Sequence, residues 1–199
     1  MNRRTNLILS IFVTLLMLSG GISVSAQGFP KKALASVTEE RARNIVGFLA
    51  DDLLQGRDAG MQGGYLAAEY IVSLFKEWGV EPFLESGYCQ PFTAVKNVNN
   101  WLTEANRDIA PLIADGCETR ELRNILAVIP GKEDGIVVVG AHYDHLGIDA
   151  TLQGDSCFNG ADDNASGVSA VLQIARAIKI SGKQPRRTII FALWDGEEK

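Results

Sequence analysis

Two apolar segments of this chain each run directly into a cluster of polar residues, and this feature most constrains the fold. Residues 136–141 read IVVVGA and continue into HYDH (142–145), whereas residues 188–194 read TIIFALW and continue into DGEE (195–198). Apolar runs of this length are typical of strands that are covered on both faces. Because open α/β sheets bind ligands at the carboxyl ends of their strands, we expect the two polar clusters to meet at one site.

The segment between these two strands predicts a crossover helix. Residues 160–167, GADDNASG, form an acidic loop, and apolar residues then recur at helical spacing from Val168 to Ile178. A strand, a helix and a second strand in this order predict a parallel crossover. Residues 124–129, NILAVI, predict another strand. Its connection to residues 136–141 is short, so we expect these two strands to be adjacent and antiparallel.

The upstream half of the chain predicts two amphipathic helices and an edge strand. Thr38 is placed as the N-cap of the first helix, ahead of two acidic residues in the first turn. Pro91 lacks an amide donor, so the strand that contains it is expected at an edge of the sheet. The predicted elements are helices over residues 38–53 and 65–79, a strand over 88–95, and loop or irregular structure over 96–121.

Residues 1–26 have the features of a secretory signal peptide. Arg3 and Arg4 precede a short apolar core, and the sequence VSA precedes Gln27. The apolar core is shorter than the roughly 20 residues that span a bilayer. We therefore expect cleavage after Ala26 and export to the periplasm or the extracellular space. The mature residues 27–199 are then long enough for one domain, without membrane contact after cleavage.

Charge and cysteine content exclude some partners and leave others open. The net charge is −5 and the chain has no basic cluster, so nucleic acid is not an expected partner. Export permits disulfides, and the three cysteines (Cys89, Cys117 and Cys157) allow one bridge with one thiol left over. The sequence selects neither a cysteine pair nor an oligomeric state.

The polar residues at the two strand ends are of types that bind zinc. His142 and Asp144 alternate at a strand end and can face the same side, which suggests His142 as a ligand and Asp144 as its hydrogen-bonding partner. Taken alone, a histidine such as His142 is more often an ordinary residue with satisfied hydrogen bonds than a ligand. His145 is expected to line the pocket and is not assigned as a ligand.

The acidic residues strengthen the case for a metal. Asp162 and Asp163 could merely cap the helix that follows, and Glu197 and Glu198 could be a solvated pair. Four carboxylates at one place exceed what capping requires, and they would repel one another strongly without a cation. Since Glu197 and Glu198 are adjacent and point in different directions, one can bind metal while the other acts as general base.

In this order, AHYDH (141–145), GADDNASG (160–167) and DGEE (195–198) resemble peptidase family M28, the co-catalytic zinc aminopeptidases and their relatives. Residues 49–83 and 123–132 are similar to upstream parts of the same family. The resemblance implies an α/β fold, namely a three-layer α/β/α sandwich of zinc exopeptidase type with a mixed, mostly parallel sheet. Residues 27–199 would then be an incomplete catalytic domain, truncated at the C-terminus.

The resemblance also implies the roles of the site residues. His142 would be the terminal ligand of one zinc, Glu198 that of a second zinc, and Asp163 would bridge both. Glu197 would be the general base toward a water activated by the two zincs, and Asp144 would orient His142. The implied activity is that of a zinc-dependent aminopeptidase, which hydrolyses N-terminal residues from peptide substrates.

Two further readings come from other functional classes. One is a glutaminyl cyclase-like transferase, which resembles the same fold but uses one zinc; residues 162–167 favour the two-metal peptidases. The other is a non-catalytic binding module of the same fold, against which the four residues His142, Asp163, Glu197 and Glu198 argue. The family's remaining ligands, an Asp and a His, are expected beyond Lys199, so this chain alone is expected to be inactive.

Overall fold

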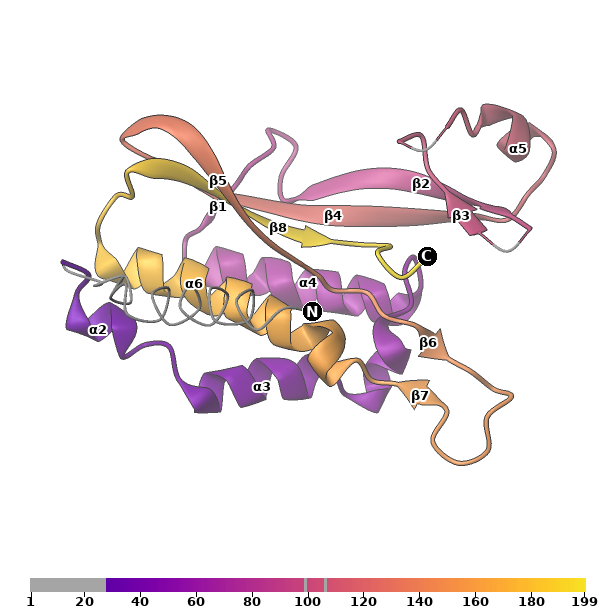
Figure 1. The fold of residues 1–199 in the computed structure, drawn as a ribbon, viewed down its shortest axis with the longest axis horizontal. Helices are drawn as coiled ribbons and strands as arrows, with labels where there is room; N and C mark the ends of the chain where they lie inside the picture. Colours follow the sequence, from indigo (N-terminus) through magenta and orange to yellow (C-terminus); the bar gives the residue numbers. More distant parts are fainter. Residues whose placement is uncertain (1–27, 99, 106) are drawn as a thin grey trace, which may run out of the picture.

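The computed structural model describes residues 28–98, 100–105 and 107–199, so the predicted signal peptide lies outside the described residues. The longer helices gather on one face of a mixed β-sheet (Figure 1). The helices are α2 (Lys31–Leu34), α3 (Glu39–Leu49), η1 (Asp52–Arg57), α4 (Gln62–Glu77), α5 (Ala110–Ala114), η2 (Ala161–Ser166) and α6 (Gly167–Ser181). The strands are β1 (Glu81–Pro82), β2 (Cys89–Asn97), β3 (Asn100–Leu102), β4 (Thr119–Ile129), β5 (Glu133–His142), β6 (Gly147–Ile148), β7 (Cys157–Phe158) and β8 (Arg187–Trp194). None of the described helices is long and apolar enough to cross a membrane.

The predicted crossover is confirmed. Strand β5 pairs in parallel with β8, with Val139 opposite Phe191, and α6 connects the two strands. Gly182 ends α6 in a left-handed conformation with φ 65°, as the Ser-Gly sequence predicted. The carboxyl ends of β5 and β8 therefore lie side by side, which places HYDH next to DGEE.

The expected adjacency of residues 124–129 and 136–141 is wrong, because β8 lies between β4 and β5 in the order β3-β2-β4-β8-β5. Neighbouring strands are about 4.8 Å apart, so the short connection after β4 can cross the start of one intervening strand. The amide of Lys132 in this connection donates to Pro185 and Arg186 just before β8. A central position covers the apolar residues of β8, of which Phe191 and Leu193 are fully buried.

The sheet is mixed, as predicted, but its parallel majority is not found in the described part of the chain. Strands β1 and β2 pair antiparallel with β4, β3 pairs antiparallel with β2, and β4 is antiparallel to β8. The parallel pairing is that of β5 with β8. The sequence pattern does not distinguish the two kinds of pairing in the upstream half, because neighbours there are selected by contacts between distant residues.

The core lies between the sheet and the helices. Phe75 of α4, Leu172 of α6 and Phe191 of β8 are fully buried there. On the other face of the sheet, Ile136 and Val138 of β5 are 60% and 55% exposed. The described residues thus supply the sheet and one helical layer of the expected three-layer sandwich.

The upstream elements agree with the prediction except in one segment. The Thr38 side chain accepts a hydrogen bond from the Arg41 amide at 3.2 Å, so Thr38 is the N-cap of α3. Pro91 lies at an open edge, since β3 pairs with β2 only over residues 95–97. Residues 96–121, expected to be irregular, contain β3, α5 and the start of β4. Residues 100–102 and 119–121 of this segment pair with residues 93–97 of β2, which a local pattern does not reveal.

Candidate metal centre

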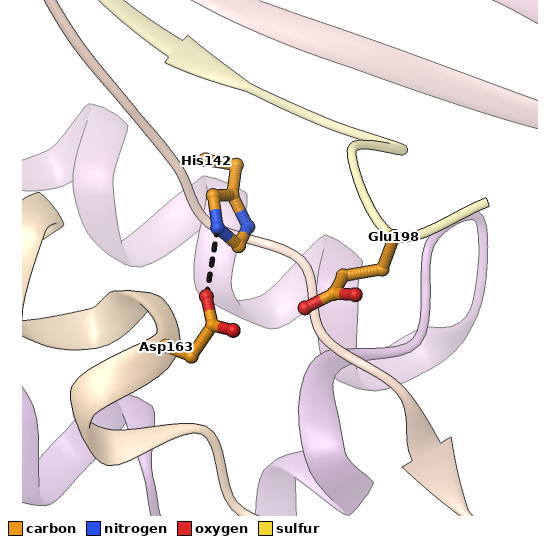
Figure 2. A group of neighbouring side chains, drawn as sticks. All are labelled: His142, Asp163 and Glu198. Atoms are coloured by element: carbon orange, nitrogen blue, oxygen red, sulfur yellow. Dashed lines mark ion pairs between the residues drawn. The ribbon is translucent and has the colours of Figure 1, made fainter.

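Three side chains from three separate elements converge beyond the carboxyl ends of β5 and β8 (Figure 2). His142 is the last residue of β5, Asp163 lies in η2, and Glu198 lies in the turn after β8. One ligand atom from each residue lies within 4.8 Å of the others. The His142 Nε2 atom is 3.0 Å from Asp163 Oδ1. The structure therefore brings together the three residues that the family resemblance implied as metal ligands.

Glu197 also reaches this cluster, from the neighbouring position. Its Oε2 atom is 3.9 Å from His142 Nε2, and its side chain is 59% exposed. The Asp163 side chain is 66% exposed, whereas that of Glu198 is 19% exposed. Asp163 and Glu197 thus present their carboxylates to solvent, where a water molecule and a substrate have access to them.

Asp144 lies beneath the cluster and is fully buried. Its two carboxylate oxygens accept hydrogen bonds from the amides of Glu197 and Glu198, both at 3.2 Å. Burial raises the pKa of Asp144, and the two amide donors oppose this shift because they stabilise the carboxylate. Asp144 therefore holds the turn that carries both glutamates.

Asp144 contacts His142 as predicted, but its main-chain oxygen lies closer to the imidazole ring than its carboxylate does. His142 Nδ1 is 3.2 Å from the main-chain oxygen of Asp144 and 3.7 Å from its Oδ1 atom. A carbonyl at the second ring nitrogen favours the tautomer in which Nδ1 carries the proton. The Nε2 lone pair of His142 then faces Asp163, as a metal ligand requires.

His145 has a role that the sequence analysis missed. Its Nδ1 atom is 3.0 Å from Glu198 Oε1, and the residue is 8% exposed. The backbone of Gly160, with φ 56°, packs against the same ring, and a Cβ atom there would lie 2.6 Å from it. His145 thus orients a carboxylate of the cluster without belonging to it. In the sequence, the presence of a second histidine in HYDH was the one indication of this contact.

Capping of the crossover helix does not use the acidic residues. The first amide of α6, that of Gly167, donates to the Asn164 side chain at 3.0 Å. No side-chain capping hydrogen bond starts η2. Because Asn164 rather than Asp163 accepts this amide, the carboxylate of Asp163 remains available to face His142.

Asp195 is a second buried carboxylate that the sequence analysis did not single out. It is 7% exposed, and its Oδ2 atom accepts a hydrogen bond from the Arg123 amide at 3.0 Å. Burial is the main cause that raises its pKa to about 6. Its own amide donates to the Asn124 side chain, so Asp195 joins the end of β8 to the middle of β4 next to the cluster.

The donor set fits zinc. Zinc binds imidazole nitrogen and carboxylate oxygen, and catalytic zinc sites use about three protein ligands with one position left for water. His142, Asp163 and Glu198 supply one imidazole and two carboxylates on one side of the site. Glu197 remains beside them as a carboxylate that is not needed for ligation.

Comparisons with known proteins agree with this donor set. Residues 124–199 match the model of peptidase family M28. A protein named "Probable leucine aminopeptidase" from Arthroderma otae is 32% identical over 143 residues, which cover 68% of this chain and 38% of that protein. This chain therefore spans well under half the length of that curated relative.

Solved structures share the fold. A zinc-dependent exopeptidase from Parabacteroides distasonis matches with a TM-score of 0.53 and 22% identity, over 81% of this chain and 47% of that one. The glutaminyl cyclase of Fimbriiglobus ruber matches with a TM-score of 0.56 and 19% identity, over 80% of this chain and 45% of that one. These similarities establish the zinc exopeptidase-like α/β fold, of which this chain covers a part. With the order of the three motifs, the family match identifies residues 124–199 as part of peptidase family M28.

Proposed function

We propose that this protein is a zinc-dependent aminopeptidase that acts on peptides. The observation that carries the proposal is the convergence of His142, Asp163 and Glu198, with the exposed carboxylate of Glu197 beside them. The aminopeptidase named in Arthroderma otae supports removal of residues from the N-terminus. Export through residues 1–26 is part of the proposal, and N-terminal sequencing of the secreted protein would test it.

The residues have separate roles in this proposal. His142, Asp163 and Glu198 would hold the zinc through one imidazole nitrogen and two carboxylates. Bound zinc supplies a Lewis acid and lowers the pKa of a coordinated water toward ~7. Glu197 accepts a proton from the attacking water and returns it to the departing amine. Asp144 and His145 keep the two glutamates in place.

A glutaminyl cyclase-like reaction is the second candidate, because the Fimbriiglobus ruber enzyme has the same fold. That likeness extends to the fold alone, whereas the aminopeptidase is the relative with the higher sequence identity.

The test uses the full natural chain, its zinc content and two substrates. We expect two zinc ions per chain by metal analysis, release of a chromophore from an aminoacyl anilide, and no cyclisation of N-terminal glutamine peptides. His142→Ala and Asp163→Ala should each lower the zinc content and abolish hydrolysis. Glu81→Gln, an exposed change at β1, is the matched control and should alter neither. Cyclisation without hydrolysis, or zinc content unaffected by both site variants, would refute the proposal.

A further inference from the structure

Arg57 is a buried cation that lies behind the candidate metal centre. It is fully buried, and it is the one lysine or arginine in the buried class among the described residues. Burying a charge is costly unless the group is paired or hydrogen-bonded. Burial lowers the pKa of Arg57, and the negative charge of Asp144 is the largest influence that opposes this shift. A group placed here at such a cost requires a physical reason.

The guanidinium group donates to main-chain carbonyls of three different segments. Nε donates to Tyr143 at 2.7 Å, and Nη2 donates to Gly160 at 2.9 Å. Nη1 donates to Asn159 at 2.6 Å and also to Leu49, the last residue of α3. Four hydrogen bonds thus engage most of the five donors of a guanidinium, a number that the three donors of lysine cannot match.

Two of these segments carry the proposed metal ligands. Tyr143 is flanked by His142 and Asp144, and Gly160 lies three residues before Asp163. Arg57 reaches the third ligand indirectly. Its own carbonyl accepts a hydrogen bond from the His145 amide at 3.1 Å, and the His145 ring contacts Glu198. The hydrogen bonds of Arg57 therefore join the segments of His142 and Asp163 directly, and they reach Glu198 only through His145.

The backbone around Arg57 adopts a strained, left-handed conformation. Gln55 and Arg57 have φ values of 49° and 48°, in the left-handed region that non-glycine residues rarely adopt. Gly56 between them has φ 64°, and a Cβ atom there would lie 2.3 Å from the Gly147 carbonyl oxygen. Such strain persists where surrounding contacts enforce it, and it often occurs near functional sites.

We propose that Arg57 is a positioning residue of the metal centre, which fixes the segments of His142 and Asp163 relative to each other through their main-chain carbonyls. This inference rests on the proposed zinc site. Residues that orient metal ligands from behind typically contribute about 10- to 100-fold in metal affinity. A residue that only stabilises the fold would instead leave the affinity of the folded protein unchanged.

The test is a competition titration of zinc in the full natural chain, with a chromogenic chelator as the competitor. For Arg57→Lys we expect zinc binding to weaken by about 10- to 100-fold. Arg176→Lys is the matched control, since Arg176 is a half-buried arginine on α6 that donates to a carbonyl far from the centre. It should bind zinc like the wild type. Cobalt substituted for zinc should give an altered visible spectrum in Arg57→Lys only.

A second variant keeps the inference testable if Arg57→Lys does not fold. The Asn159 side chain holds the same loop from its other side, through hydrogen bonds of 2.7 Å to the Ala50 carbonyl and to Asp52. Asn159→Ala should weaken zinc binding by roughly 10-fold, the lower end of the same range. Unchanged zinc affinity in the folded variants, with melting temperatures lowered equally with and without zinc, would overturn the positioning role.

The outcome is distinguishable from failure of the proposed function. If the wild type binds zinc and His142→Ala does not, the zinc site stands and the Arg57 result alone decides the inference. If the wild type binds no zinc, the proposed function and this inference both fail.

Discussion

The carboxylates around the centre form two groups that differ in burial and in their partners. Asp144 and Asp195 are buried, and each accepts main-chain amide donors. Asp163 and Glu197 are largely exposed, and their oxygens point to His142 or to solvent. The same chemical group therefore serves two purposes: the buried pair holds strand ends and turns in place, and the exposed pair is available for metal, water and substrate.

This contrast suggests which changes affect chemistry and which affect stability. An exposed carboxylate contributes little to folding, because water solvates it nearly as well in the folded state. A buried carboxylate has lost water and depends on its donors, so its removal or titration alters the free energy of unfolding. Each of the following experiments asks whether the two groups separate in this way.

The largest effect is expected for Glu197→Gln in the full natural chain. Glutamine keeps the shape but cannot accept the proton, so turnover of an aminoacyl anilide should fall by roughly 10²- to 10⁴-fold. Zinc content should remain that of the wild type, and the free energy of unfolding should change by less than about 0.5 kcal/mol. Unchanged turnover would show that Glu197 is not the base.

The next largest effect is the contribution of Asp195 to the pH dependence of the free energy of unfolding. Its pKa rises from 3.8 to about 6 in the folded state, so the folded protein binds this proton more tightly than the unfolded chain does. The stabilisation is complete below about pH 4 and is lost as the pH rises through about 6. At ~1.36 kcal/mol for each pH unit between the two values, the loss is on the order of 3 kcal/mol.

Urea unfolding of the wild type and of Asp195→Asn, measured across this pH range, would reveal the contribution. Asparagine keeps an acceptor for the Arg123 amide but does not titrate, so the difference between the two proteins isolates Asp195. The wild type should lose stability relative to the variant as the pH rises. Parallel pH profiles would mean that Asp195 titrates normally.

A smaller effect is expected for Asp144→Asn. One carboxylate oxygen becomes an amide donor that faces a main-chain amide, so one of the two hydrogen bonds to the glutamate turn is lost. We expect zinc affinity to fall by about 10-fold or more and the free energy of unfolding to fall by about 1–3 kcal/mol. A variant with normal zinc affinity would show that the turn keeps its shape without Asp144.

The smallest effect is expected at an exposed carboxylate remote from the centre. Glu39 forms an ion pair with Arg43 one helical turn away, at 2.7 Å, and both side chains are mostly exposed. Glu39→Gln should cost roughly 0.3–1 kcal/mol, measured by urea unfolding, through the ion pair and the helix dipole. Turnover should not change. If Glu39→Gln lowered the free energy of unfolding as much as Asp144→Asn does, buried and exposed carboxylates would not differ in their contribution to stability.

Local patterns in the sequence determined the elements that build the centre. Apolar runs ending in polar residues marked β5 and β8, and the spacing of residues 168–178 marked α6. The parallel crossover then follows from the order of these elements, so convergence of a histidine, aspartates and two glutamates could be predicted. The family resemblance selected Asp163 and Glu198 among them. The same patterns assigned the N-cap at Thr38, because capping depends on neighbouring residues only.

Tertiary structure alone decided the features that depend on distant residues. The insertion of β8 between β4 and β5 reflects which arrangement buries the apolar side chains of β8, and no local spacing records that choice. Arg57 lies 86 residues before Tyr143 and is adjacent to it in space, while the ring of His145 meets a carboxylate 53 residues later. Main-chain carbonyls and amides make most of these contacts, and every residue has them, so the side-chain sequence carries almost no sign of such a network.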